Sequence, residues 1–459
     1  MSVDVAIVGC GPVGALIANL LGRRGLSVAV IEKQPKPYPL PRAIHFDGEA
    51  MRAFQAAGLA DAVLPHTHVG KGMLFQDSTG RTLIDWSREQ VLGPMGWFES
   101  YRFHQPGLEA ALVSGLERFD RVSLRRGVSV DGIVQTKADV TLTLSDDSTL
   151  TARHVVACDG AQSTLRQQQD MGWTDLGFQE RWLVVDAQLT RSRPDLGDHS
   201  IQHCHAKYPA TYVRGTGDRR RWEIRLSDSD PDSPTDAQVW QKLARWITPA
   251  DAQLDRAAVY VFRSGVATRW QQGRVLLAGD AAHQMPPFMG QGMCAGVRDA
   301  ANLCWKLALA VQRESTDLLD SYQSEREANV RAFINRSMAL GRLINQTDPD
   351  RLPQGQMKSI WPDLGPGLGP RDGIGGKLAP QGRTTDGHLA DDLSFPGFHL
   401  LCRDSLTDAF SQALLPCVVD DTGWLGDHGL AAALIRPDGY ALAGVKTVDD
   451  LPKALAHLP

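Results

Sequence analysis

The sequence predicts an α/β fold in which a parallel sheet, opened by a βαβ unit, is interleaved with a second sheet. Three observations predict it. Residues 4–32 contain a buried strand, a glycine-rich turn, a helix and a second strand. Two later strands end in acidic turns, at Asp159-Gly160 and Gly279-Asp280, and shorter alternating strands lie between them. This order indicates that the chain adds strands to its first sheet after long segments that belong to other parts of the fold.

The first βαβ unit has the spacing of a dinucleotide-binding site. Its turn follows the pattern Gly-x-Gly-x-x-Gly and its second strand ends in an acid; the residues are Gly9, Gly11, Gly14 and Glu32. The glycines permit a tight turn, a close approach of the backbone to a pyrophosphate, and close packing of helix on strand. Free N–H groups at the helix start favour an anion, and the acid suits a ribose diol. The pattern predicts a dinucleotide without saying which one.

Periodicity predicts the elements that follow this unit. Four prolines up to Pro41 indicate an extended loop before a helix that begins near Asp47. We expect short strands between residues 73 and 97 and one helix over residues 101–119. Alternating apolar residues predict a meander of strands over residues 128–133, 140–144 and 155–158.

The second half of the chain adds a second sheet and a terminal unit. Strands are expected at residues 182–189, 210–214 and 221–226, followed by a polar turn over 227–236 and a helix. A Gly/Pro-rich turn then leads into a helix that starts from about Gly296 and covers residues 299–311. The Gly/Pro-rich stretch from Gly365 to Gly376 indicates a linker into a C-terminal unit.

Composition narrows the class of protein. A chain of 459 residues with 42% hydrophobic residues can bury a large core, and its length suggests two or three domains. A net charge of -5 gives no broad electrostatic reason to bind nucleic acid or an anionic membrane. The seven cysteines show no CxxC pair and no ligand spacing, so neither a disulfide framework nor a metal site is expected. With no leader or long apolar run, we expect a soluble cytoplasmic protein that binds small molecules.

Two later motifs discriminate among dinucleotide-binding proteins. CDGAQSTLR (158–166) and GRVLLAGDAAHQMPPFMGQGMCAGVRDAANLCWKLALAV (273–311) each close a strand far from the first unit. Together with that unit they resemble the FAD-dependent aromatic hydroxylases, which are single-component flavin monooxygenases. The blocks PRAIHFDGEAMRAF and DLGFQERWLVVDAQL look closest to 3-(3-hydroxyphenyl)propionate hydroxylase-like and polyketide hydroxylase-like members. The resemblance covers residues 1–340 and is weaker beyond.

The resemblance implies a domain organisation. A discontinuous Rossmann-type (GR2-like) FAD-binding domain would comprise residues 1–72, 100–175 and 265–340, and a β-sheet substrate-binding domain residues 73–99 and 176–264. Residues 341–380 would form a linker and residues 381–459 a small thioredoxin-like unit. Because that unit has no CxxC, we do not expect it to exchange disulfides, and we expect it to have a structural or dimer-supporting role. The whole protein is expected to be a monomer or a homodimer.

The resemblance also implies how FAD is held. Gly9, Gly11, Gly14 and Glu32 match the pyrophosphate and adenosine-ribose contacts. Arg42 and Gln105 match residues near the pyrophosphate and ribityl chain, Asp280 matches the acid on the ribityl hydroxyls, and Asp159 belongs to a motif shared between flavin and nicotinamide recognition. The flavin ring would meet the loop and helix start formed by Pro287, Gly290, Gly292 and Met293, whose N–H groups and helix dipole suit the anionic reduced ring.

The reaction implied is hydroxylation of a phenolic or other aromatic substrate by NADH or NADPH and O2 through a C4a-hydroperoxyflavin. Pro287 and Gly290 would shape the site, and His45, or alternatively His104, would serve as the base that deprotonates the phenol. Tyr212, Arg214 and Trp222 are candidate substrate contacts. Two alternatives stay open: a Baeyer–Villiger or epoxidising oxygenase on a polyketide-type substrate, and a flavin-binding protein without oxygenase turnover.

Overall fold

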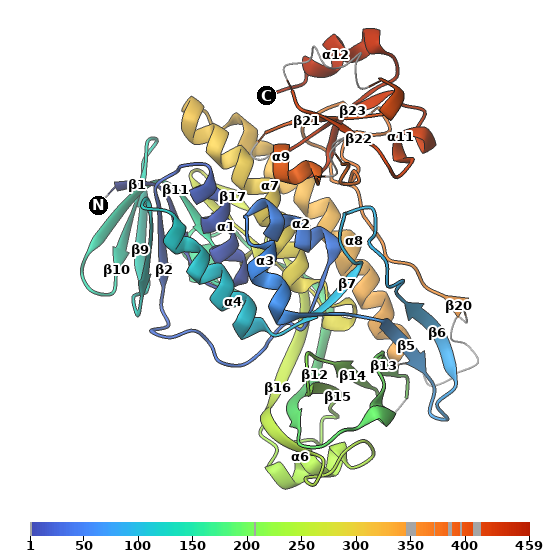
Figure 1. Cartoon of the computed structure of the whole chain (residues 1–459). Coiled ribbons are helices and arrows are strands. Elements are labelled where there is room, and N and C mark those ends of the chain that lie inside the picture. Colours follow the sequence, from blue (N-terminus) through green and yellow to red (C-terminus); the bar gives the residue numbers. More distant parts are fainter. Residues whose placement is uncertain are drawn as a thin grey trace.

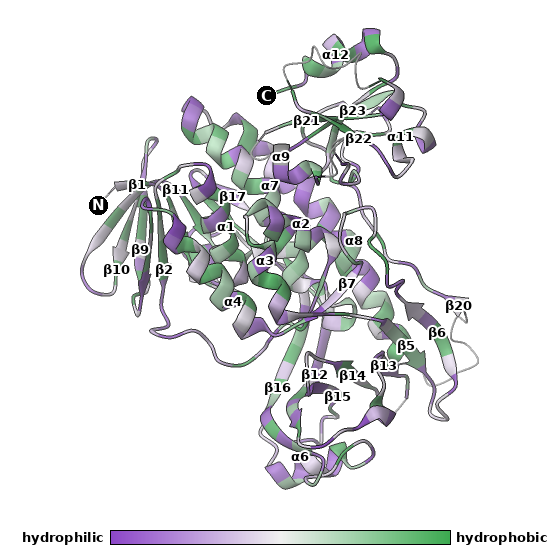
Figure 2. Cartoon of the chain, in the orientation of Figure 1, coloured by the Kyte–Doolittle hydropathy of each residue, from purple (hydrophilic) through white to green (hydrophobic). Residues whose placement is uncertain are grey.

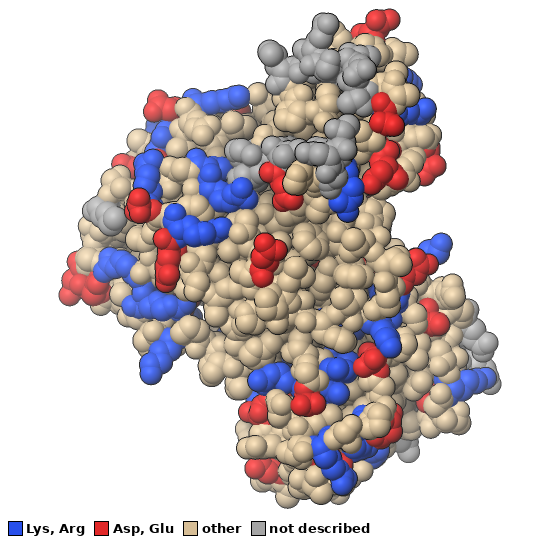
Figure 3. Space-filling model, viewed as in Figure 1, with Lys and Arg blue, Asp and Glu red and all other residues tan. Residues whose placement is uncertain are grey.

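The computed structural model describes residues 2–205, 208–345, 355–370, 372–383, 388–394, 397–406 and 415–459. Figure 1 shows a first sheet and a second sheet on either side of a central group of helices, with a small C-terminal unit beside those helices. None of the described helices combines the length and the apolarity needed to span a membrane. On the face shown in Figure 3, basic and acidic residues are interspersed.

The first sheet is mainly parallel and carries the predicted βαβ unit. Its described strands are, in spatial order, β17 (Gln271–Gln272), β18 (Val275–Leu277), β11 (Thr149–Ala157), β1 (Ser2–Val8), β2 (Val28–Glu32) and β8 (Val122–Arg126), with β10 (Val140–Leu144) and β9 (Val130–Gln135) branching from β11. The register places Ile7 of β1 between Val30 and Val156. The expected meander therefore returns to the parent sheet, where β11 pairs with β1.

Helices cover this sheet and form the main core with it. They are α1 (Pro12–Arg23), α2 (Gly48–Ala56), α3 (Ala60–Val63), α4 (Gln105–Ser114), α5 (Thr164–Gln168), α7 (Gly292–Arg313) and α8 (Asp320–Ile344). Figure 2 shows hydrophobic residues along β1, β11 and the helices beside them. A Cβ on Gly14 would lie 2.0 Å from the Gly9 carbonyl oxygen, so only glycine lets α1 pack this closely on the turn.

Residues 100–103 form a strand, and the expected helix over 101–119 is wrong at its start. The strand β7 (Ser100–Phe103) lies between β3 (His45–Asp47) and β4 (Thr67–Val69) in a small sheet. All four of its residues are buried. Pro106 lies in the first turn of α4, where the missing N–H costs no hydrogen bond, and so marks the true start of the helix.

The helix α7 begins at Gly292, earlier than the expected start near Gly296. Gly290 has a left-handed backbone (φ 64°) and ends the short turn η5 (Pro287–Met289). Because Gln291 then caps the helix, the turn leads into it without a connecting loop. Other 3-10 turns are η1 (Leu64–His66), η2 (Gly115–Arg118), η3 (Pro194–Leu196), η4 (Gly279–Ala281), η6 (Asp317–Leu319), η8 (Asp404–Leu406) and η9 (Val448–Asp450).

The second sheet is largely antiparallel and one of its faces is covered by a helix. Its strands, in order, are β19 (His283–Gln284), β16 (Ala252–Val266), β12 (Thr174–Leu189), β15 (Arg219–Arg225), β14 (Ala210–Arg214), β13 (Ser200–His203), β5 (Gly72–Gln76), β6 (Thr82–Ser87) and β20 (Gly355–Gln356). The long strands β12 and β16 lead away from the helices in Figure 1, and α6 (Asp236–Leu243) lies at their far end. Thr235 begins α6 with a capping box.

The C-terminal unit contains a four-stranded sheet in its described part. The strands are β22 (Cys417–Val419), β21 (His399–Cys402), β23 (Ala432–Ile435) and β24 (Ala441–Val445), with helices α9 (Ala390–Ser394), α11 (Trp424–Asp427) and α12 (Leu451–Leu455). Its likeness to thioredoxin stays a prediction, as do the domain boundaries. Helix α8 continues to Ile344, and β20 joins the second sheet from the segment expected to be a linker.

Candidate active site

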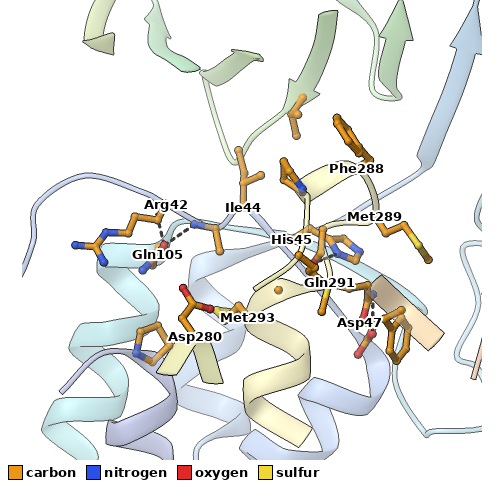
Figure 4. Close-up of a pocket in the computed structure, with 18 of the residues that line it drawn as sticks. Arg42, Ile44, His45, Asp47, Gln105, Asp280, Phe288, Met289, Gln291 and Met293 are labelled. Atoms are coloured by element: carbon orange, nitrogen blue, oxygen red, sulfur yellow. Dashed lines mark hydrogen bonds between the residues drawn. The ribbon is translucent and has the colours of Figure 1, made fainter. Parts of the chain in front are cut away.

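A cavity of about 430 Å³ lies between the first sheet, the second sheet and the start of α7. Its nucleotide-side lining comprises Gly11, Pro12, Val13, Arg42, Gln105, Cys158, Gly160, Ala161 and Asp280. Its other walls include Met73, Trp86, Arg88, Glu99, Arg102, Thr211, Val213, Arg221, Glu223, Phe262, Phe288, Met289 and Trp361. Figure 4 shows Arg42, Gln105 and Asp280 on one side and His45, Asp47 and Gln291 on the other.

Two helix starts line this one cavity. The first turn of α1 contributes Gly11 to Val13, and the first turn of α7 contributes Gln291 to Met293. Unsatisfied backbone N–H groups and the helix dipole make each start favourable for negative charge. A Cβ built on Gly11 would meet nothing within 4 Å, so the backbone there is open to a ligand. The arrangement suits an extended ligand with anionic groups at two points.

The other residues of the first motif build the turn rather than the cavity wall. Gly9 has φ 102°, and a Cβ there would lie 2.4 Å from the Cys158 carbonyl oxygen. The Glu32 carboxylate accepts hydrogen bonds from the amides of Cys10 (2.7 Å) and Gln34 (2.8 Å). Gly9, Gly14 and Glu32 do not line the cavity. Contact of Glu32 with a ribose therefore stays a prediction.

Asp159 and Asp280 both carry carboxylate oxygens without a partner among the described residues. The Asp159 Oδ2 atom accepts from the Leu165 amide (3.1 Å), whereas its buried Oδ1 atom has no hydrogen bond. The Asp280 side chain opens into the cavity, and burial in the surrounding protein raises the pKa of its carboxyl. An acceptor left open in this way suits the hydroxyl groups of a polyol ligand.

Gln105 and Arg221 hold the loop that carries Arg42. The Gln105 Oε1 atom accepts from the backbone amides of Arg42 (2.8 Å) and Ala43 (2.6 Å). Arg221, from the second sheet, donates to the carbonyls of Pro41 (2.7 Å) and Arg42 (2.6 Å) and is ion-paired with Asp186 (2.7 Å). Contact of Arg42 and Gln105 with FAD stays a prediction, and Arg221 is a residue that the sequence did not single out.

His45 is half-buried at the cavity edge, and both of its ring nitrogens are engaged. Its Nδ1 atom lies 3.2 Å from the Gly290 carbonyl oxygen and its Nε2 atom 3.1 Å from Ser100 Oγ. Burial and the nearby Arg102 guanidinium lower the pKa of His45 to about 3. The imidazole is therefore neutral and a weak base at neutral pH, and its contact with Gly290 fits a positioning role. His104 lies outside this cavity.

A buried charge network supports the start of α7. Arg298 donates to Asp47 Oδ2 (2.5 Å), Glu49 Oε2 (2.5 Å) and Gln291 Oε1 (2.9 Å). Tyr440 of the C-terminal unit donates to the other Glu49 oxygen (2.7 Å). Burial opposes ionisation of Asp47, but Arg298 and the Ala50 amide outweigh it and lower the pKa of that carboxyl. The network is fully paired, which suits a structural support.

The predicted substrate contacts lie on the wrong face of the second sheet. Tyr212 and Trp222 pack with Val239 and Trp246 under α6, and Arg214 hydrogen-bonds to Asp198 and neighbouring carbonyls. None of the three predicted contacts lines the cavity. Because side chains alternate along a strand, the cavity receives the neighbouring residues instead: Thr211, Val213, Arg221 and Glu223.

Comparison with known proteins agrees with this arrangement. The model of the FAD binding domain family matches residues 2–337. A probable NADH-specific resorcinol 4-hydroxylase from Rhodococcus jostii (strain RHA1) is 34% identical, over 98% of this chain and 93% of its own length. A 3-(3-hydroxy-phenyl)propionate/3-hydroxycinnamic acid hydroxylase from Paraburkholderia xenovorans (strain LB400) is 37% identical over 76% of this chain, which spans 56% of that protein.

Solved structures share the fold. A flavin-dependent monooxygenase in complex with FAD and substrate superimposes with a TM-score of 0.83 at 20% identity, covering 99% of this chain and 98% of its own. An aklavinone-11 hydroxylase with FAD and aklavinone gives a TM-score of 0.82 at 21% identity, with coverage of 99% and 98%.

The fold and the cavity define a flavin-dependent oxidoreductase, and the open backbone at Gly11, the free Asp280 carboxylate and the two helix starts fit FAD. The chain belongs to the FAD binding domain family. The expected class, the FAD-dependent aromatic hydroxylases, and FAD as cofactor are confirmed.

Proposed function

We propose that this protein hydroxylates a phenolic substrate with O2 and a reduced nicotinamide cofactor. The observation that carries the proposal is one continuous cavity that is lined by two helix starts, by Asp280 and by a mixed apolar and charged wall from the second sheet. The resorcinol and hydroxyphenylpropionate hydroxylases among the relatives support a phenol as substrate, and the first of these supports NADH.

FAD, when bound, supplies the redox and oxygen chemistry. We assign its pyrophosphate to the start of α1, its ribityl hydroxyls to Asp280, and the anionic edge of its ring to the start of α7. Pro287 and Gly290 shape the last of these contacts, and His45 holds Gly290 in place. The apolar side chains of Phe262, Phe288 and Met289 exclude water from the reacting ring.

The direct test measures NADH and NADPH oxidation by the purified yellow protein with a panel of phenols and isotopically labelled O2. We expect a cognate phenol to accelerate oxidation and to gain one oxygen atom from O2. A protein that stays colourless after reconstitution with FAD, or that transfers no oxygen to any phenol tested, would contradict the proposal. Product structure distinguishes ring hydroxylation from Baeyer–Villiger oxidation or epoxidation.

Asp280 gives a test of the cofactor assignment. We expect Asp280→Ala to weaken FAD binding by about 10- to 100-fold, since a charged hydrogen-bond acceptor is lost from the ribityl chain. Fluorescence titration of the apoprotein with FAD measures the change. Asp255→Ala, at an exposed acid on β16, is the control, and equal FAD affinity in both variants would rule out the contact.

We also propose a reducing, cytoplasmic location and a monomer or homodimer. None of the seven cysteines is in a disulfide, which agrees with a reducing compartment. Size-exclusion chromatography with light scattering measures the oligomeric state.

A further inference from the structure

Arg102 is a buried arginine without an acidic partner. Its side chain lines the cavity, yet Arg102 is only 6% exposed. The guanidinium donates to Ser200 Oγ (3.0 Å) and more weakly to the Gly72 carbonyl (3.4 Å). In the part of the chain that the structure describes, no Asp or Glu lies within ion-pair distance of it. Burial and the neighbouring Arg88 lower the pKa of Arg102 to about 10, and no carboxylate offsets them.

Three other arginines in or beside the cavity wall are neutralised by protein carboxylates, whereas Arg42 and Arg263 line the cavity as exposed side chains. Arg221 is paired with Asp186 at 2.7 Å, Arg298 with Asp47 at 2.5 Å, and Arg88 with Glu99 at 3.6 Å. A buried charge without a counter-charge is costly, so proteins retain one mainly where a ligand completes it. Among the described arginines that line the cavity, Arg102 therefore combines burial with the lack of a protein counter-charge.

The backbone places Arg102 beside the expected flavin ring. In the register of β3 and β7, Arg102 is the cross-strand partner of His45, so both side chains project from one face of the small sheet. His45 in turn contacts Gly290, in the turn before α7. The titratable groups that face Arg102 from the packed elements are Arg88, His45 and His68, the last of these on β4. His45 is neutral, so it does not supply the missing negative charge.

We propose that Arg102 binds an anionic oxygen of the aromatic substrate and so orients the ring toward the flavin. This inference rests on the proposed function and names the substrate class: an aromatic compound that carries a phenolate or a carboxylate. A guanidinium forms paired hydrogen bonds with such oxygens. If the oxygen is phenolic, Arg102 also stabilises the ionised form, which makes the ring carbon more nucleophilic without a strong protein base.

The test measures ligand binding to the FAD-loaded oxidised enzyme by calorimetry, without NADH, so that no turnover is needed. The probes are 3-(3-hydroxyphenyl)propionate, its phenol methyl ether, its amide, and resorcinol. They are titrated into the wild type, Arg102→Gln, Arg102→Lys and the control Arg214→Met, whose side chain lies outside the cavity. FAD content and circular dichroism establish that each variant is folded.

We expect Arg102→Gln to weaken only probes that carry the recognised oxygen, by about 10- to 100-fold. If that oxygen is a phenolate, resorcinol and the amide lose affinity and the methyl ether does not. If it is a carboxylate, the acid and its methyl ether lose affinity and the other two do not. Arg102→Lys, which keeps the charge without the paired geometry, should show the same selectivity with a smaller loss, and it decides the matter if Arg102→Gln does not fold.

Equal losses for all four probes, or no loss for any of them, would overturn the inference. The proposed function is judged separately, by whether the wild type forms a hydroxylated product.

Discussion

At the scale of single residues, polar groups around the cavity either form hydrogen bonds within the protein or keep hydrogen-bonding capacity for a ligand. The Glu32 carboxylate and the Gln105 amide oxygen each accept two backbone hydrogen bonds and so define loops. Asp280 and Arg102 keep hydrogen-bonding capacity open to the cavity. The distinction depends on partners rather than residue type, because a buried polar group must be satisfied by the protein or by a ligand.

His45 makes stability dependent on acid pH. Its pKa falls from an ordinary 6.5 to about 3 in the fold, because of burial and Arg102. A depressed folded pKa means that this stabilisation is complete above pH 6.5 and is lost as pH falls toward 3, by about 1.4 kcal/mol per pH unit. We expect His45→Asn to remove this part of the acid sensitivity. Urea unfolding across that pH range measures it, with the exposed His457→Asn as control; parallel wild-type and His45→Asn profiles would contradict the assignment.

Substitution of Trp222 tests whether this residue packs the core or contacts the substrate. Its indole is fully buried against Tyr212 and Trp246, away from the cavity. We expect Trp222→Ala to lower the free energy of unfolding by about 3–5 kcal/mol and to leave the ratio of product to NADH consumed unchanged. Phe262→Ala, on the cavity side, is the matched variant and should lower that ratio because water enters. A lower ratio of product to NADH consumed in Trp222→Ala, with no change in Phe262→Ala, would show that Trp222 contacts the substrate.

At the scale of elements, hydrogen bonds connect the C-terminal unit to the start of α7. The connection runs from Tyr440 through Glu49 and Arg298 to Gln291, which lines the cavity. Helices α2 and α7 are joined by the same guanidinium, since Asp47 caps α2. The position of the α7 start, to which we assign the flavin ring, therefore depends on a unit distant in sequence.

Tyr440→Phe tests this connection. Loss of its hydroxyl leaves Glu49 Oε1 without that donor, so we expect a loss of about 1–3 kcal/mol of stability and weaker FAD retention. Tyr212→Phe is a suitable control because Tyr212 is a buried tyrosine that packs under α6, outside the cavity. FAD release on mild urea treatment measures the effect. Retention equal to that of Tyr212→Phe would show that Tyr440 does not support the site.

At the scale of the whole molecule, buried ion pairs join the C-terminal unit to the flavin-binding part. Arg436, between β23 and β24, donates to both oxygens of Glu325 on α8, at 3.0 and 2.8 Å. Lys306 on α7 contacts the same carboxylate at 2.6 Å. Removing one partner from such a cluster leaves buried charge uncompensated. We therefore expect the two parts to unfold together.

Arg436→Met should lower the free energy of unfolding by about 3–5 kcal/mol. Arg125→Met, which removes an exposed pair with Asp146, should change it by less than about 1 kcal/mol. Urea unfolding followed by circular dichroism and by flavin fluorescence measures both, and we expect coincident transitions in the wild type. Separate transitions, or equal effects of the two substitutions, would show that the C-terminal unit is independent.

Some of the site could be predicted because its signals are local. The glycines at 9, 11 and 14 and the acid at 280 occupy turns whose geometry depends on a few neighbouring residues. Arg102 was missed because residues 101–103 were included in the helix expected over 101–119. Their pairing with β3, where Arg102 lies opposite His45, shows that they form a strand. Trp361 was missed because it lies in a segment expected to be a linker.

The sequence by itself determined the dinucleotide-binding βαβ unit and the presence of two sheets, since these depend on short motifs and on residue periodicity. The class and the cofactor followed from the resemblance of its later motifs to a known family. Only the tertiary structure decided which face of the second sheet meets the substrate. Alternation along β15 separates Trp222 and Ile224 from Arg221 and Glu223, but the pattern is the same for either orientation. The apolar face packs on α6 and the polar face lines the cavity. The reason is that large apolar side chains gain more free energy when they are removed from water against a helix than when they line an open cavity.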